Sequence, residues 1–238
     1  MQNLLMEVIN MIKIENAVLP NARQIEIIIK GMRNPLNSWN RIDTDVLNKT
    51  SLVDIELGDN DYDLMKRLTK AGKDHRKFMR MMNVYMDITA PLYWWKEFDT
   101  YKIGTTANSC STMHKITAKE FTLNDFSCEH LEDFDEPFKK DNNGLTRFAW
   151  FKTSLESTID ILNYARELFL ETKDKKYWWQ IIQLLPSSYN QKRIVMLNYE
   201  VLSNMYHSRK NHKLDEWRNF CKWIETLPYS ELITGDFK

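Results

Sequence analysis

Residues 186–209 read PSSYNQKRIVMLNYEVLSNMYHSR, and the pattern changes twice along this stretch. Pro186 ends the helical spacing that precedes it, and PSSYNQ has the composition of a turn. Residues 193–199 form a short apolar run, which favours a strand. Helical spacing returns over residues 202–209. The stretch therefore predicts a turn, a strand and a helix in succession.

Helices dominate the rest of the chain. Residues 59–72 contain a capping Asp59 or Asn60, an apolar face and a terminating Gly72, which together predict a helix. Pro91 suits the first turn of another helix, which carries many aromatic residues. The helices expected on spacing alone cover residues 92–102, 146–171, 174–185 and 214–227.

Two further strands and two loops complete the expected fold. Residues 22–30 mix short alternation with an isoleucine run before Gly31, and residues 78–89 alternate weakly, so both segments predict strands. Residues 104–112 are small and polar, and residues 129–144 are highly charged, so both are expected to be loops. With no repeat and no change of composition, residues 1–238 predict a single, helix-rich α+β domain.

Composition excludes several classes of protein. The 238 residues contain 33 Lys plus Arg and 33 Asp plus Glu, so no charge excess favours nucleic acid or an anionic membrane. The three cysteines form no CxxC pair, which argues against a disulfide scaffold or a zinc ribbon. Glu7 and Asn10 interrupt the apolar N-terminus, and no run is long enough to span a membrane. We therefore expect a cytoplasmic protein without nucleic-acid or membrane partners.

Motif searches exclude the common nucleotide and metal sites. The six glycines are too widely spaced for a GxGxxG turn or a GxxxxGK phosphate loop. The five histidines form no HExxH, and no cluster has metal-ligand spacing, so no metal is expected. The aromatic runs 93–95 and 178–179 lie within helical periods, which favours core packing over base stacking.

Three segments in order resemble the flavin-dependent thymidylate synthases, the ThyX family: KAGKDH (70–75), residues 90–114 and residues 186–209. The last segment matches the family's strand followed by a helix start with spaced Asn and Arg residues, here Asn198, Asn204 and Arg209. Residues 90–114 resemble its signature helix and loop. The resemblance implies a mixed sheet with flanking long helices.

The same resemblance implies an activity and a set of site residues. Members of the family bind FAD, form homotetramers and transfer a one-carbon unit from methylenetetrahydrofolate to the uracil ring of dUMP, with NADPH as reductant. Arg209 and Ser111 are implied as catalytic, since a cation beside a ring carbonyl oxygen stabilises developing negative charge. The flavin contacts implied are His75, Tyr101, Lys102, Asn108, Asn198 and Asn204; the substrate contacts implied are Glu97, Ser109, Ser111 and Arg209.

The chain also departs from the family's signature. Ser109, Met113 and Glu200 stand where the family has Glu, Arg and Arg, and Ile182 stands where it has another arginine. Met and Ile cannot hold phosphate oxygens as a guanidinium does. Two alternatives therefore stay open. One is the same scaffold acting on a different pyrimidine nucleotide, with phosphate held by Lys102, Lys115 or Arg193; the other is a catalytically inactive nucleotide- or flavin-binding oligomer.

Ordinary roles compete with each functional assignment. Arg209 precedes Lys210 and is also typical of a helix surface, and Ser111 and Asn108 are common turn residues. Cys110 lies between serines with no base or cation beside it in the sequence, which favours a small loop residue over a nucleophile.

Overall fold

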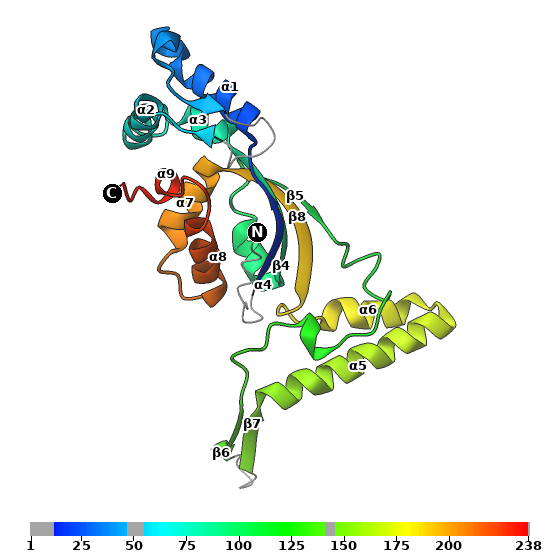
Figure 1. The fold of residues 1–238 in the computed structure, drawn as a ribbon. Helices are drawn as coiled ribbons and strands as arrows, with labels where there is room; N and C mark the ends of the chain where they lie inside the picture. Colours follow the sequence, from blue (N-terminus) through cyan, green and yellow to red (C-terminus); the bar gives the residue numbers. More distant parts are fainter. Residues whose placement is uncertain (1–11, 47–54, 141–145, 238) are drawn as a thin grey trace. The chain divides into compact units, whose positions relative to one another are not determined.

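The computed structural model describes residues 12–46, 55–140 and 146–237 (Figure 1). A four-stranded sheet has the order β1 (Lys13–Val18), β4 (Asn83–Pro91), β8 (Asn190–Asn198) and β5 (Thr106–Ser109). Alternate residues of β4, from Val84 to Ala90, are buried, as expected for a strand with one face against a core. The predicted α+β class is confirmed, and the strand predicted over 193–199 forms as part of β8, except that Tyr199 begins the next helix.

The described chain divides into two compact units. The first, here called the α5 unit, comprises residues 89–95 and 109–192 of the described chain. The second, the α7 unit, comprises residues 12–88, 96–108 and 193–238, and its last residue lies outside the described ones. The expectation of a single domain over residues 1–238 stays a prediction.

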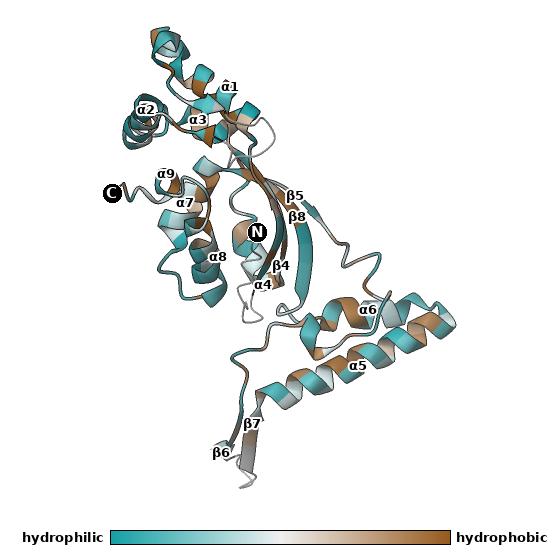
Figure 2. Cartoon of the chain, in the orientation of Figure 1, coloured by the Kyte–Doolittle hydropathy of each residue, from teal (hydrophilic) through white to brown (hydrophobic). Residues whose placement is uncertain are grey.

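The α5 unit is built around a helical hairpin. α5 (Phe151–Thr172) packs against α6 (Lys175–Leu184), and the reversal uses Lys173 in a left-handed conformation with φ 57°. Asp174 then caps α6 by accepting a hydrogen bond from the Lys176 amide. Figure 2 shows polar and apolar segments alternating along α5. The buried core consists of Ile116, Phe121, Phe126, Leu155, Ile159, Leu162, Ala165 and Ile181.

A two-stranded hairpin completes the α5 unit and corrects two expectations. β6 (Asp133–Lys140) pairs antiparallel with β7 (Thr146–Trp150), so the charged loop expected over 129–144 contains a strand. The helix expected from residue 146 begins instead at Phe151. The register shifts on both sides of Pro137, which lacks the amide hydrogen that a regular ladder needs. Charge and a proline concealed the strand in the sequence.

Among its described residues, the α7 unit contains six further helices, α1 to α3 and α7 to α9. α7 (Tyr199–Arg209) packs against α8 (Asp215–Glu225) and α9 (Glu231–Thr234), which are drawn in orange to red in Figure 1. Hydrogen bonds also join them, since Tyr199 donates to the Pro228 carbonyl oxygen and Ser203 to that of Ile233. The other helices are α1 (Ala22–Arg33), α2 (Asp59–Lys70) and α3 (Lys77–Met81), and a short pair of strands is formed by β2 (Asp45–Val46) and β3 (Ile55–Glu56).

Helix α1 replaces the strand expected over residues 22–30. Asn21 and Gln24 form a capping box, in which each side chain accepts the other residue's backbone N–H, at 2.9 and 2.8 Å. Ile25, Ile28 and Ile29 are buried at helical spacing. Similarly, the small polar loop expected over 104–112 contains β5, and the strand expected over 78–89 begins at Asn83, after α3.

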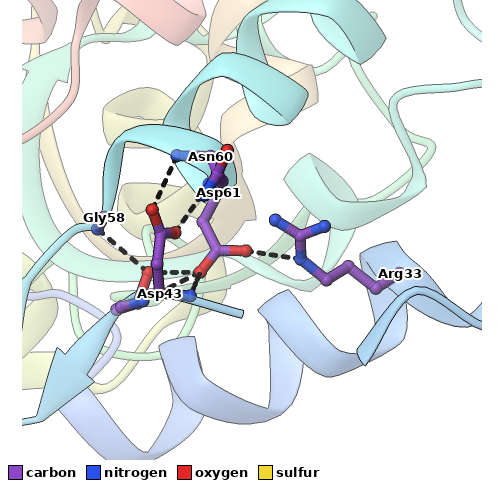
Figure 3. A network of polar contacts seen from close by, with 6 residues as sticks. Arg33, Asp43, Gly58, Asn60 and Asp61 are labelled. Carbon is purple, nitrogen blue, oxygen red and sulfur yellow. Dashed lines mark hydrogen bonds and ion pairs between the residues drawn. The ribbon is translucent and has the colours of Figure 1, made fainter. Parts of the chain in front are cut away.

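A polar network that is buried at Arg33 and Asp61 joins the segment before β2 to the start of α2 (Figure 3). Arg33 Nε lies 2.6 Å from Asp61 Oδ1, and the second Asp61 oxygen accepts from both the amide and the hydroxyl of Thr44. Asp43 caps α2 by accepting from the Asn60 and Asp61 amides. Although burial acts to raise the pKa of Asp43, these amide hydrogen bonds lower it.

Helix α4 (Leu92–Phe98) follows β4 as expected, although it ends earlier than residue 102. Its residues 92–95 belong to the α5 unit and its last three to the α7 unit. Among the described residues, no helix combines the length and apolar character needed to cross a bilayer.

Candidate functional site

Arg209 occupies the last position of α7, and its guanidinium contacts three side chains of the α7 unit. Its Nη1 lies 2.8 Å from Glu97 Oε2, and its Nε donates to the Tyr101 hydroxyl at 2.9 Å. The guanidinium carbon also lies 5.0 Å from the centre of a Trp217 ring and 5.7 Å from that of Tyr101. Both distances suit cation–π contacts, so two aromatic rings and a carboxylate hold the cation.

Glu97 is the centre of the hydrogen bonding. Besides Arg209, the Trp217 indole Nε1 donates to Glu97 Oε2 at 2.8 Å, and His212 Nε2 lies 3.4 Å from the same oxygen. His212 Nδ1 accepts from the Leu214 amide at 3.2 Å, which leaves the ring hydrogen of a neutral imidazole on Nε2, facing Glu97. We call Glu97, Tyr101, Arg209, His212 and Trp217 the Arg209 cluster.

Local structure fixes the elements that carry the cluster. Trp217 is fully buried on α8, so its indole has one orientation. The turn after α7 is closed by the His212 amide donating to the Arg209 carbonyl oxygen at 2.9 Å. Arg218 adds hydrogen bonds to the carbonyl oxygens of His212 and Lys213, at 2.7 and 2.9 Å. The side chains of Glu97 and Arg209 remain 36% and 19% exposed, so a ligand can reach them.

The start of α7 lies against the turn that follows α4. Asn198 is buried and caps α7, with its side-chain oxygen accepting from the Val201 amide at 3.1 Å. Gly104 has φ +79°, and a Cβ built there would lie 2.9 Å from Asn198 Nδ2. Glycine at this position therefore permits the close approach. Asn198, implied as a flavin contact, has its oxygen engaged within the fold.

The other residues implied by the resemblance lie outside this cluster. His75 is exposed in the turn after α2, Lys102 and Asn108 are exposed, and Asn204 is half-buried on α7. Ser109 and Ser111 are exposed and belong to the α5 unit, where Ser111 Oγ accepts from the amides of Met113 and His114. The structure thus brings together Glu97, Tyr101 and Arg209 of the residues named from the sequence.

His212 and Trp217 are the members of the cluster that sequence reasoning did not assign to a site. Trp217 falls on the apolar face of α8, where an aromatic residue indicates core packing. His212 follows the helix within an ordinary polar turn. Only its position three residues after Arg209 could have drawn attention to it, because the turn of the chain brings the two back to the same carboxylate.

The arginines around α7 are paired with carboxylates. Arg193 Nη1 lies 2.7 Å from Asp99, and Arg218 pairs with Asp215. Glu200, which replaces the family's arginine, binds Arg80 through both oxygens, at 2.5 and 3.2 Å. These bonds raise the pKa of Arg80. Of the three candidate phosphate ligands, Lys102 and Lys115 are exposed lysines and Arg193 already holds a carboxylate.

The part of the chain that the structure describes contains no group of side chains arranged as a metal-binding site. No group of three or more His, Cys, Asp or Glu side chains is arranged there to hold a metal ion. The acidic network of Figure 3 is engaged with backbone amides, a hydroxyl and Arg33.

Comparison of the sequence with protein families and with curated proteins finds no match. Solved structures do match. A structure of the thymidylate synthase ThyX from Helicobacter pylori with FAD and dUMP is 15% identical, with a TM-score of 0.59 over 93% of this chain and 95% of that one. A second complex of ThyX from this organism with FAD and dUMP gives 16% identity and a TM-score of 0.59 over 96% and 100% of the two chains.

A related enzyme with another name also matches. The UMP/dUMP methylase PolB from Streptomyces cacaoi, bound to 5-Br UMP, is 11% identical, with a TM-score of 0.58 over 94% of each chain. At such identities these likenesses establish the fold. The chain therefore has a ThyX-like fold, as the three sequence segments predicted.

Proposed function

We propose that the protein is a flavin-dependent enzyme that transfers a one-carbon unit to the uracil ring of dUMP, with methylenetetrahydrofolate as donor and FAD as cofactor. The observation that carries the proposal is the Arg209 guanidinium held beside two aromatic rings, partly exposed and within a ThyX-like fold. A fixed cation beside a ring carbonyl oxygen stabilises the negative charge that develops when the ring carbon attacks an electrophile.

The residues present fit a flavin in part. His75 and Lys102 are exposed groups that can carry positive charge toward phosphate oxygens, and Asn108 has an exposed amide, whereas Asn198 is committed to capping α7. We therefore assign FAD binding to His75, Tyr101, Lys102, Asn108 and Asn204, with Asn198 supporting the fold around them. When bound, reduced FAD supplies the hydride equivalent of the reaction, and NADPH is the proposed reductant.

An absorbance spectrum of the purified protein tests the cofactor. We expect a yellow protein with flavin bands, and an increase in melting temperature when FAD is added to flavin-depleted protein, because a ligand that binds the native state stabilises it. A colourless preparation whose melting temperature does not respond to FAD would overturn the proposal.

The second candidate function keeps the scaffold and changes the acceptor. It is favoured by the fold shared with PolB, which is described as a UMP/dUMP methylase, and by Met113 and Ile182 in place of arginines. Melting temperatures with dUMP and UMP, followed by rescue of a thymidine-requiring host, separate the two candidates. Rescue selects dUMP; bound flavin and a response to UMP without rescue select the alternative.

We also propose a homotetramer in the cytoplasm. In the α5 unit, Phe151, Ile161 and Tyr164 expose between 52% and 63% of their surface on α5, which suits contact with another copy. Light scattering after gel filtration gives the mass directly, and a monomer would overturn this part of the proposal. An oligomer with neither flavin nor a nucleotide response would instead select the inactive binding protein.

A further inference from the structure

The guanidinium of Arg209 already has a carboxylate counter-ion within its own chain. Glu97 Oε2 lies 2.8 Å from Arg209 Nη1, so one negative charge stands beside the one positive charge. A phosphate that binds another nitrogen of Arg209 would also lie close to this carboxylate. Two like charges at about 4 Å repel by roughly 1 kcal/mol even in water and by more where the dielectric constant is lower.

Glu97 is also held independently of Arg209. The Trp217 indole donates to the same carboxylate oxygen at 2.8 Å, and His212 Nε2 lies at 3.4 Å. Trp217 is buried on α8, and the imidazole of His212 is oriented by the Leu214 amide. An incoming anion therefore cannot simply displace the carboxylate from the guanidinium, because two further groups retain it there.

A neutral ring carbonyl meets a different environment. It accepts a hydrogen bond from the guanidinium without opposing the charge of Glu97, and the rings of Tyr101 and Trp217 lie 5.7 and 5.0 Å from the guanidinium carbon. Arg209 can thus contact Glu97 through one nitrogen and a carbonyl oxygen through another, since the guanidinium carries five donors.

We propose that Glu97 is a specificity-determining residue: as the counter-ion of Arg209, it directs that guanidinium to a carbonyl group of the substrate ring and keeps phosphate away from it. Trp217 and His212 act as positioning residues for Glu97. The inference rests on the proposed function for the identity of the ring. The statement about charge at Arg209 does not depend on it.

The isosteric variant Glu97→Gln tests the proposal, because it removes the charge and keeps an oxygen for Trp217. Calorimetric titration with inorganic phosphate, deoxyuridine and dUMP gives the affinities. We expect Glu97→Gln to bind phosphate about tenfold more tightly than the unsubstituted protein, with a smaller change for deoxyuridine. Adding Arg209→Gln to this variant should remove the gain.

Asp63→Asn provides the control, since it removes a carboxylate charge from an exposed pair with Arg67 on α2, outside the Arg209 cluster. The proposal is overturned if Glu97→Gln shows no gain in phosphate affinity, or if Glu97→Gln and the control variant show equal gains. If phosphate binding increases only in Glu97→Gln but neither deoxyuridine nor dUMP binds any form, the assignment of charge at Arg209 stands and the proposed function fails.

Discussion

Two arginine–aspartate pairs of the α7 unit differ in their exposure to solvent. Arg33 and Asp61 are 3% and 0% exposed, whereas Arg67 and Asp63 on α2 are 68% and 57% exposed. A buried ion whose partner is removed keeps its full desolvation cost, whereas an exposed ion is solvated by water. The network of Figure 3 therefore stabilises the fold, and its buried pair of Arg33 and Asp61 contributes most of that stabilisation.

We expect Arg33→Met to lower the free energy of unfolding by about 3 kcal/mol, because Asp61 loses its counter-ion in a buried site. Arg67→Met should cost less than about 0.5 kcal/mol, as is usual for an exposed pair four residues apart on a helix. Urea denaturation followed by circular dichroism measures both. Equal losses in the two variants would show that burial does not distinguish the pairs.

The sequence predicted some residues of the candidate site and missed others. The resemblance of two segments to the ThyX family named Glu97, Tyr101 and Arg209, which meet in the structure. His212 and Trp217 were not assigned because the contact depends on the turn after α7 and on the packing of α8. Such contacts depend on tertiary structure, which cannot be predicted from the spacing of residues along one helix.

Among the elements, capping explains one error and one success. Residues 22–30 have an isoleucine run that suggested a strand, yet the Asn21–Gln24 capping box was present in the sequence and favours the helix that forms. The order of strand and helix was predicted correctly for β8 and α7, although the Asn198 cap starts α7 at Tyr199, three residues before the predicted helix over 202–209. The hairpin of β6 and β7 was missed, since Pro137 and the surrounding charges are typical of a loop.

The turn before β5 lies close to the cap of α7. Two glycines with the same φ allow a controlled test of this close approach. Gly104 and Gly235 both have φ +79°, but a Cβ at Gly235 would have no neighbour within 4 Å. We expect Gly235→Ala to cost about 1 kcal/mol from backbone strain alone. Gly104→Ala should cost at least about 1 kcal/mol more, because Asn198 must shift and weaken its cap.

Thermal or urea unfolding of the two alanine variants provides the comparison. Asn198→Ala serves as a further control, since in that background the additional cost of Gly104→Ala over Gly235→Ala should be smaller; the rest comes from Val201 Cγ2, 3.1 Å from the same Cβ. A Gly104→Ala variant no less stable than Gly235→Ala would contradict the close approach of the turn to the helix cap.

At the scale of the whole molecule, the class of fold followed from the sequence, whereas the division into units did not. Helical spacing and three predicted strands indicated an α+β chain, although one of those strands is helix α1. The resemblance of three ordered segments to the ThyX family predicted the ThyX-like fold found by structural comparison. No composition change marks the boundaries of the two units, because each is assembled from separate stretches of the chain. Such interleaving leaves no linker for a sequence to reveal.

The buried thiol of Cys221 and the buried phenol of Tyr206 make the stability of the α7 unit depend on pH in the alkaline range. Burial raises the pKa of the Cys221 thiol from 9.0 to about 12. Burial, with a hydrogen bond to Glu225, raises that of Tyr206 from 10.0 to about 12. The native state therefore retains protons that the unfolded state releases. The stabilisation is complete below pH 9 for the thiol and below pH 10 for the phenol, and it is lost as pH rises toward 12.

We therefore expect the melting temperature to fall steeply between pH 9 and pH 12, the interval that separates the unfolded and native pKa values of Cys221. Cys221→Ala, which has no thiol to ionise, should show a shallower fall, even though loss of the buried sulfur lowers its stability at neutral pH. Cys110→Ala is the control, because Cys110 is exposed and its removal should leave the alkaline slope unchanged. An identical slope in the Cys221 variant would mean that ionisation of this thiol does not contribute to alkaline unfolding.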